Sequence, residues 1–309
     1  MQDNQEKTLQ DYVESVEGSP ANQEIKIPAP EMPWQREEMP LGNRIGLIPL
    51  KIEDLPTRGL FYPKDTTIAI RSATGAEIRH WSTLQEDDPA RLDDMVNYVI
   101  ERCVVIKSND PKVRHTSWKD IKEVDRFYLL LAIHELTFAN GENKLQIKIS
   151  DTKNIEVIKD MISYTKLDTR LMKYYNEEER CFVLNFKSGK SIQVDMPCVG
   201  VTQFLKNYII RKQQYQEYID EDYLSFAPFV IRNWRGLSDD MYNHYIEDSQ
   251  KWDVAVISVL TEIRNIFADA IDPVVTYKDE GGVTQTAPLN FQGGIKSLFL
   301  ISNPFDELV

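Results

Sequence analysis

Hydrophobic and polar positions alternate with a period of two in several stretches of the chain. The stretches are 66–72 (TTIAIRS), 145–149 (LQIKI), 181–186 (CFVLNF) and 191–196 (SIQVDM). This pattern is typical of a β-strand with one buried face, because successive side chains of a strand point to opposite faces. The last two stretches flank Ser188-Gly189, a pair that favours a tight turn. Together they predict a β-hairpin.

Other stretches have apolar residues at helical spacing and recognisable start signals. Asp88 is a favoured N-cap and Pro89 a favoured first helical residue, so we predict a helix from here to Cys103. Thr74 predicts the cap of a shorter helix that runs through Trp81.

Further along, Ser117 with Asp120 three residues later matches a weak capping box. It predicts a helix whose apolar stripe continues to Leu131. The remaining sections predicted to be helical are 155–180, 204–219 and 252–267.

These patterns predict an α+β fold, in which helices pack with short antiparallel strands and a hairpin and a mainly helical C-terminal region follows. Residues 1–44 are polar and acidic and then proline-rich, which predicts an extended N-terminal arm. We assign the α+β core to 45–200 and the C-terminal region to 201–309. Trp34 of the arm is a candidate anchor, either to a neighbouring protein or to the chain's own domain.

Composition narrows the possible partners. The 309 residues carry a formal net charge of -13, and 42% of them are hydrophobic. A strongly acidic chain is a poor match for nucleic acid or for an anionic membrane surface, since both require basic patches. No apolar run approaches the roughly 20 residues that cross a bilayer, and the polar N-terminus predicts no secretory signal. The three cysteines are far apart, so we predict small apolar fillers in a reducing compartment.

The sequence offers little catalytic chemistry. The four histidines have no metal-ligand spacing, and the glycine-rich phosphate motifs and the nucleophile-elbow motif are missing. Paired acids such as Asp87-Asp88 and Asp93-Asp94 are expected at solvated helix starts. We therefore predict no catalytic residues, no metal, no cofactor and no small-molecule ligand. A cell-wall hydrolase remains an alternative that only the acidic pairs support.

The stretch LPTRGLFYP, residues 55–63, is here called the lead segment. Its two prolines fix φ and bias the preceding residues toward extended backbone, and its glycine tolerates a positive φ. We predict a stiff corner that orients the arm toward a partner; the alternative is an ordinary turn under a loop. The interface candidates in it are Leu55, Pro56, Gly59, Phe61, Tyr62 and Pro63.

Tyrosines in the C-terminal half are a second set of interface candidates. Tyr208 and Tyr215 combine apolar area with a polar tip, a profile typical of protein interfaces. An equally open interpretation is that such tyrosines flank a core.

The order of several segments resembles a known family. The lead segment precedes IRSATGAEIRHW, an acidic gap, LDDMVNYVIERCVV with Cys103, VDRFYLLLAIHELTF with Asp125, and KLQIKIS. This order resembles the baseplate protein family of T-even-like tailed bacteriophages, which contains a baseplate hub subunit and related tail assembly proteins. The resemblance covers about residues 54–200. Family members often carry a cysteine-rich piece after the second helix, but this chain reads ANGENKLQIKIS there, without cysteine.

The resemblance implies a structural or assembly protein of a contractile phage tail, at the baseplate hub. It implies other tail and baseplate proteins as partners, assembly in the host cytoplasm and a place in the virion. The alternative is a tail assembly chaperone that is absent from the mature particle; acidity and a tyrosine-rich helical region would suit the masking of a client.

Overall fold

The computed structural model describes residues 46–299, apart from 86, 111–112, 114, 139–143, 151–152, 165–168, 272 and 280. The chain divides into two units, 1–44 and 45–309. The predicted arm with Trp34 lies outside the described residues. Residues 45–309 form one unit, so the expected division at residue 200 does not separate two compact parts.

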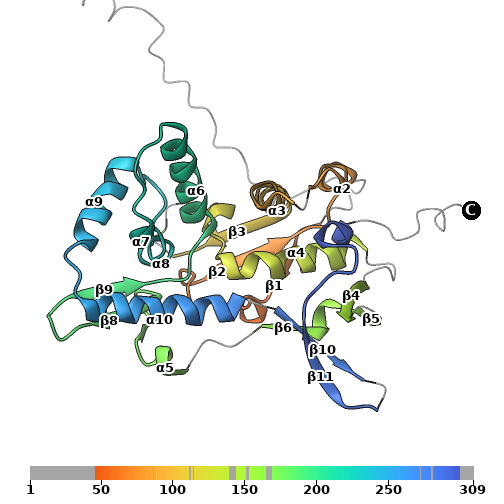
Figure 1. Ribbon diagram of the computed structural model, residues 1–309. Coiled ribbons are helices and arrows are strands. Elements are labelled where there is room, and N and C mark those ends of the chain that lie inside the picture. The colour runs from red at the N-terminus through yellow and green to blue at the C-terminus, as the bar shows by residue number, and fades with distance from the viewer. Residues whose placement is uncertain are drawn as a thin grey trace, which may run out of the picture. The chain divides into compact units, whose positions relative to one another are not determined.

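The fold is α+β, as predicted. A three-stranded antiparallel sheet has the order β1-β2-β3, with β1 at Ile48–Leu50, β2 at Thr66–Ile70 and β3 at Val104–Ser108. Helices α3 (Pro89–Cys103) and α4 (Glu123–Thr137) pack against each other and contact this sheet (Figure 1).

The predicted helix starts are confirmed for the first two helices. Thr74 caps α2 (Gly75–Ser82) in a complete capping box with Glu77. Asp88 caps α3 by accepting hydrogen bonds from two backbone N–H groups of its first turn, and Pro89 is its first residue. These starts depend on residues within three positions of each other, which is why local sequence predicts them.

The helix predicted from Ser117 is interrupted. Ser117 and Asp120 do form a capping box, but for the short 3-10 helix η4 (Trp118–Asp120). Ile121 is then extended, with ψ 133°, and Lys122 forms an antiparallel bridge with Cys198 before α4 begins at Glu123. The tertiary pairing of the backbone therefore overrides helix continuation.

The other described strands form small antiparallel sheets. Strands β4 (Leu145–Ser150) and β5 (Lys153–Val157) pair with each other, and β7 (Tyr175–Asn176), β8 (Cys181–Asn185) and β9 (Ser191–Val194) form a second sheet. The predicted hairpin is β8–β9. The predicted helical section 155–180 is wrong: it holds parts of β5, η5 (Lys159–Met161), β6 (Ile162–Tyr164), the short helix α5 (Thr169–Met172) and β7.

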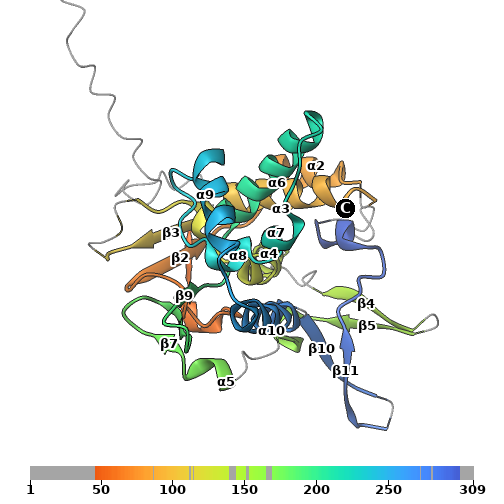
Figure 2. The same cartoon turned by 60° about the vertical axis from the view of Figure 1, so that its left-hand side comes forward.

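The C-terminal region is helical up to Ile271 and then returns to the core. Its helices are α6 (Val199–Gln214), α7 (Glu221–Leu224), α8 (Ala227–Val230), α9 (Asp239–Ser249) and α10 (Val254–Ile271). Strands β10 (Pro273–Lys278) and β11 (Thr284–Pro288) follow as a hairpin, visible in Figure 2, and η6 (Ile295–Phe299) follows them. Because β10 pairs with β6, this region is joined to the core by a sheet.

Buried side chains of the described residues form three hydrophobic clusters. One lies among the β1–β3 sheet, α2–α4 and η6, a second between the β8–β9 hairpin and α10, and a third among α6–α9. None of the described helices is long and apolar enough to cross a membrane.

Candidate functional site

The lead segment folds as a compact double turn; how it orients the arm is not tested, because the arm lies outside the described residues. Two consecutive residues, Arg58 (φ 52°) and Gly59 (φ 74°), adopt the left-handed conformation. The backbone N–H of Leu60 donates to the carbonyl of Thr57 at 3.1 Å. A Cβ atom at Gly59 would lie 3.2 Å from Ile52 Cγ1, so glycine suits this position both for its φ and for the space around it.

A buried carboxylate of α4 holds the lead segment. Asp125 is fully buried and accepts three hydrogen bonds: from Thr57 N–H at 2.9 Å, Thr57 Oγ1 at 2.7 Å and Tyr62 OH at 2.8 Å. Burial raises the pKa of Asp125 to about 6, while the donated hydrogen bonds oppose that rise. We call Thr57, Tyr62 and Asp125 the lead–helix cluster.

Lys122, just before α4, extends this cluster toward the hairpin. Its backbone N–H donates to Tyr62 OH at 3.0 Å, and its Nζ donates to Asp195 Oδ1 at 2.9 Å and to the carbonyl of Met196 at 3.1 Å. Burial raises the pKa of the Asp195 carboxyl, and the neighbouring Lys122 and Arg232 cations oppose this shift. The Lys122–Asp195 ion pair is almost completely buried, so removing Asp195 would leave the Lys122 ammonium group without its carboxylate.

The loop after α8 is held by hydrogen bonds to Asp120 of η4. Trp234 Nε1 and Arg235 Nη1 both donate to Asp120 Oδ1 at 2.8 Å. Trp234 packs so closely on α6 that a Cβ atom at Gly200 would lie 2.3 Å from its ring. Glycine at this position therefore permits α6 and the loop to meet.

A cleft of about 290 Å³ lies where these parts meet. Its lining includes Phe61, Pro63, Ile106, Lys122, Arg180, Asp195, Cys198, Arg232 and Arg235. Several charged groups of its lining are paired with one another: Lys122 with Asp195, Arg235 with Asp120, and Arg232 with Glu179. Burial raises the pKa of the Cys198 thiol, which keeps it protonated and weakly nucleophilic. This arrangement stabilises the junction of the lead segment, the hairpin and the helices.

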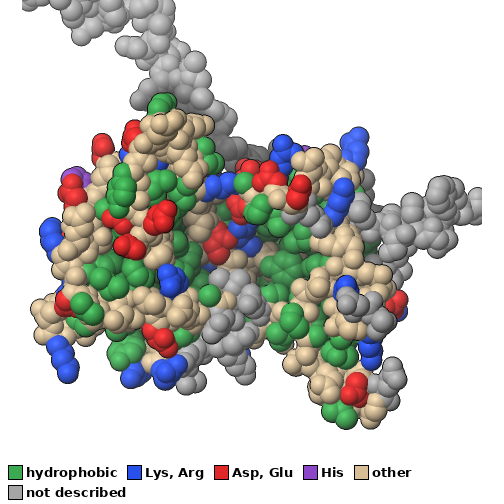
Figure 3. Space-filling model, viewed as in Figure 1, with side chains coloured by type: hydrophobic (Ala, Val, Ile, Leu, Met, Phe, Trp, Pro, Cys, Tyr) green, Lys and Arg blue, Asp and Glu red, His purple; other side chains and the backbone are tan. Residues whose placement is uncertain are grey.

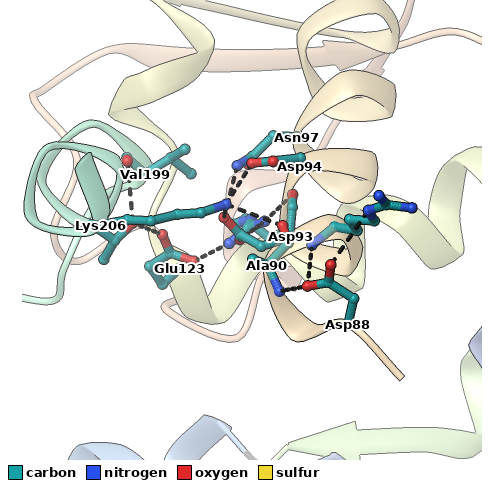
Figure 4. Close-up of polar contacts among 11 residues, drawn as sticks. Asp88, Ala90, Asp93, Asp94, Asn97, Glu123, Val199 and Lys206 are labelled. Carbon is teal, nitrogen blue, oxygen red and sulfur yellow. Dashed lines mark hydrogen bonds and ion pairs between the residues drawn. The ribbon is translucent and has the colours of Figure 1, made fainter. Parts of the chain in front are cut away.

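A second polar network joins α3, α4 and α6 (Figure 4). Arg126 of α4 pairs with Asp93 of α3 at 2.7 Å and with Glu123 of its own helix. Lys206 of α6 pairs with Asp94 and donates to the carbonyl of Ala90 at 3.0 Å. Asp93, one of the acids behind the hydrolase alternative, is thus engaged in ion pairs that hold helices together.

The structure corrects four of the predicted interface residues. Their side chains are buried in the fold and offer little surface to a partner: Leu55, Phe61, Tyr62 and Tyr208 are each at most 3% exposed. Leu55 and Tyr62 belong to the first hydrophobic cluster and Phe61 to the second, so the lead segment connects two cores. The physical reason is that Thr57 and Tyr62 of the segment donate hydrogen bonds to the buried carboxylate of Asp125.

The remaining predicted interface residues differ in their surroundings. Pro56, Gly59 and Pro63 are half-buried in the lead segment. Tyr215 is 73% exposed and stays available to a partner. No sequence pattern singles out Thr57, Lys122 or Asp195, and no spacing signal links Lys122 to Asp195, which is 73 residues away.

Within the described part of the chain, no group of three or more His, Cys, Asp or Glu side chains is arranged to hold a metal ion. Cys103, Cys181 and Cys198 are all free thiols in the interior, as expected of apolar fillers.

Comparison of the chain with protein-family models, with curated proteins and with solved structures finds no match.

Proposed function

We propose that this protein is a structural or assembly subunit of a bacteriophage contractile tail, acting at the baseplate hub through protein–protein contacts. The proposal starts from the resemblance in residues 54–200 to the T-even-like baseplate family.

The observation that carries the proposal is the lead–helix cluster. The segments that carry the resemblance include the lead segment and the helix that bears Asp125, which are more than 60 residues apart. In the fold these two stretches meet through three hydrogen bonds to one carboxylate. Residues that resemble a family pattern therefore work together as one structural element, which supports treating the pattern as more than chance spacing.

The surface supports a role in assembly. Large apolar side chains that are at least 38% exposed recur along the C-terminal helices and the loop after α6, namely Ile210, Tyr215, Tyr218, Met241, Tyr245, Val254, Ile257 and Val259. Aromatic side chains and methionine are enriched in protein interfaces, and tyrosine is among the residues that contribute most of the binding energy there.

The test is co-purification from infected cells. A tagged copy of the chain, produced during infection by the phage that encodes it, is expected to bring down tail and baseplate proteins in fixed ratios. A tagged unrelated protein of similar negative charge serves as the control. Absence of tail components from the purified material, or equal amounts with the control, would contradict the proposal.

Mass spectrometry of purified particles distinguishes between the two alternatives, a built-in subunit and an assembly chaperone. A built-in subunit is present in a fixed number per particle, whereas a chaperone associates with tail intermediates and is missing from finished virions.

A further inference from the structure

The loop between α6 and α7, residues 215–220, displays aromatic side chains to solvent. We call it the tyrosine loop. Tyr218 is 83% exposed and Tyr215 is 73% exposed, the two highest values among the exposed tyrosines of the described residues. Tyrosines in a folded monomer usually bury much of their ring, since the ring is a large apolar surface. Two such rings exposed within four residues make this loop a candidate surface for contact with another molecule.

The tyrosine loop is held in a defined conformation. At the end of α6, Gln216 N–H donates to the carbonyl of Gln213 at 3.1 Å and Glu217 N–H to the carbonyl of Lys212 at 2.9 Å. This is a Schellman motif, with Gln216 in the left-handed conformation (φ 53°). At the other end, Asp220 caps α7. The two rings are therefore presented on a preorganised backbone, which lowers the entropy lost on binding.

Acidic side chains lie beside the exposed ring of Tyr218. An open surface groove of about 540 Å³ is lined by Glu217, Tyr218, Ile219, Glu221 and Asp222. Glu221 and Asp222 are exposed and make no ion pair with any described residue. Figure 3 shows acidic and hydrophobic side chains interspersed over the helices α6–α9. The groove thus offers apolar contact and unneutralised negative charge in one place.

The molecule itself contains an example of the contact that such a surface favours. Lys212 Nζ lies 5.4 Å from the centroid of the Tyr208 ring and also pairs with Glu217. One ammonium group is thus bound by an aromatic face and a carboxylate together, at the base of the tyrosine loop.

We propose that the tyrosine loop and its acidic groove dock a basic, amphipathic segment of a partner protein, whose Lys or Arg residues pair with Glu221 and Asp222 while its apolar side chains cover Tyr215 and Tyr218. This inference specifies the kind of partner that the protein would bind in its assembly role, and to that extent it rests on the proposed function. The charge of the groove selects a cationic partner, and the exposed rings require apolar residues in the same segment.

The test uses purified full-length protein and a fluorescent 18-residue peptide of Lys and Leu at amphipathic helical spacing. Binding is followed by fluorescence anisotropy. A peptide with Glu in place of Lys and a peptide with Ser in place of Leu are the ligand controls. We expect the Lys/Leu peptide to bind, the Glu/Leu peptide not to bind, and the Lys/Ser peptide to bind at least about tenfold more weakly, as both charge and apolar contact contribute.

Matched variants locate the site. The double variant Tyr215→Ser/Tyr218→Ser and the double variant Glu221→Gln/Asp222→Asn are each expected to weaken binding by about tenfold or more. The controls are Tyr174→Ser, at a tyrosine that is 43% exposed elsewhere, and Glu177→Gln/Glu178→Gln, at another exposed acidic pair. These controls are expected to bind as the unchanged protein does.

Two results would overturn the inference: no binding of the Lys/Leu peptide, or equal losses in the tyrosine-loop variants and the control variants. Because this assay contains no phage component, it is independent of co-purification from infected cells. A chain that binds the peptide at the tyrosine loop but never associates with tail proteins would refute the proposed function and leave the docking surface intact.

Discussion

The hydroxyl of Tyr62 donates a 2.8 Å hydrogen bond to the carboxylate of Asp125 and accepts the backbone N–H of Lys122 at 3.0 Å. A single side chain from the lead segment thus satisfies both the carboxylate in the first turn of α4 and a backbone donor just before the helix. This relationship closes the lead segment over the start of α4.

Removal of the carboxylate is expected to loosen the lead segment. In Asp125→Ala the Thr57 N–H loses its acceptor, and we expect a loss of about 3 kcal/mol in the free energy of unfolding. Asp125→Asn keeps an acceptor for that N–H and is expected to lose less. Urea unfolding gives the energies, and trypsin cleavage after the exposed Arg58 is expected to be faster in the alanine variant. If Asp125→Ala is as stable as a control substitution at the exposed Asp87, the carboxylate does not hold the segment.

The same carboxylate has a distinct pH signature. Its pKa is raised to about 6 in the folded protein, against 3.8 when unperturbed. Between these values the folded state binds a proton that the unfolded state does not, so the contribution of Asp125 to stability improves as pH falls from about 7 to 4. The stability of the unchanged protein relative to Asp125→Asn is therefore expected to rise over this window by up to about 3 kcal/mol. A difference that stays constant between pH 7 and 4 would contradict this.

Glu77 of α2 is expected to behave in the opposite way. Burial would raise the pKa of its carboxyl, but hydrogen bonds from Arg71 and Thr74 outweigh burial and lower the pKa to about 2. Its contribution is therefore present above about pH 4.5 and is lost as pH falls toward 2. Glu77→Gln is expected to destabilise the protein at pH 7 by about 1 kcal/mol, as in other caps, and to matter less near pH 2. Thermal unfolding of both proteins at the two pH values measures this.

The close approach of α6 to Trp234 predicts a severe effect of one methyl group. A Cβ atom at Gly200 would overlap the Trp234 ring at 2.3 Å, so Gly200→Ala is expected to cost about 1–3 kcal/mol and to shift tryptophan fluorescence. Gly75→Ala is the matched control, because a Cβ atom there meets nothing within 4 Å. Equal stability of the two variants would show that the ring moves aside without cost.

The C-terminus of α6 predicts a stabilising substitution. Gln216 occupies the left-handed position of the Schellman motif, where glycine is strongly preferred. Gln216→Gly is expected to stabilise the protein by about 0.5–1 kcal/mol. Gly189→Ala, at φ 83° in the hairpin turn, is expected to destabilise it by a similar amount. Chemical denaturation of both variants checks the opposite signs.

The amino-acid sequence alone determined the elements whose signals are local. The capping box at Thr74, the Asp88-Pro89 helix start and the hairpin around Gly189 each depend on contacts among a few neighbouring residues. The α+β class followed from these elements, because apolar spacing distinguishes helices from strands before they pack.

Tertiary structure alone decided where some of these elements end and which side chains are buried. The helix expected from Ser117 stops because the backbone of Lys122 pairs with that of Cys198. The section 155–180 is mostly non-helical because β5 pairs with β4 and β6 pairs with β10. The lead segment is buried because its Tyr62 hydroxyl donates a hydrogen bond to the carboxylate of Asp125, which lies 63 residues further along the chain. Tyr208 became core and Tyr215 remained in solvent through the packing of α6 on α9. The free energy of such long-range contacts depends on partners that no local pattern identifies, which is why burial and the candidate docking surface emerge only from the folded chain.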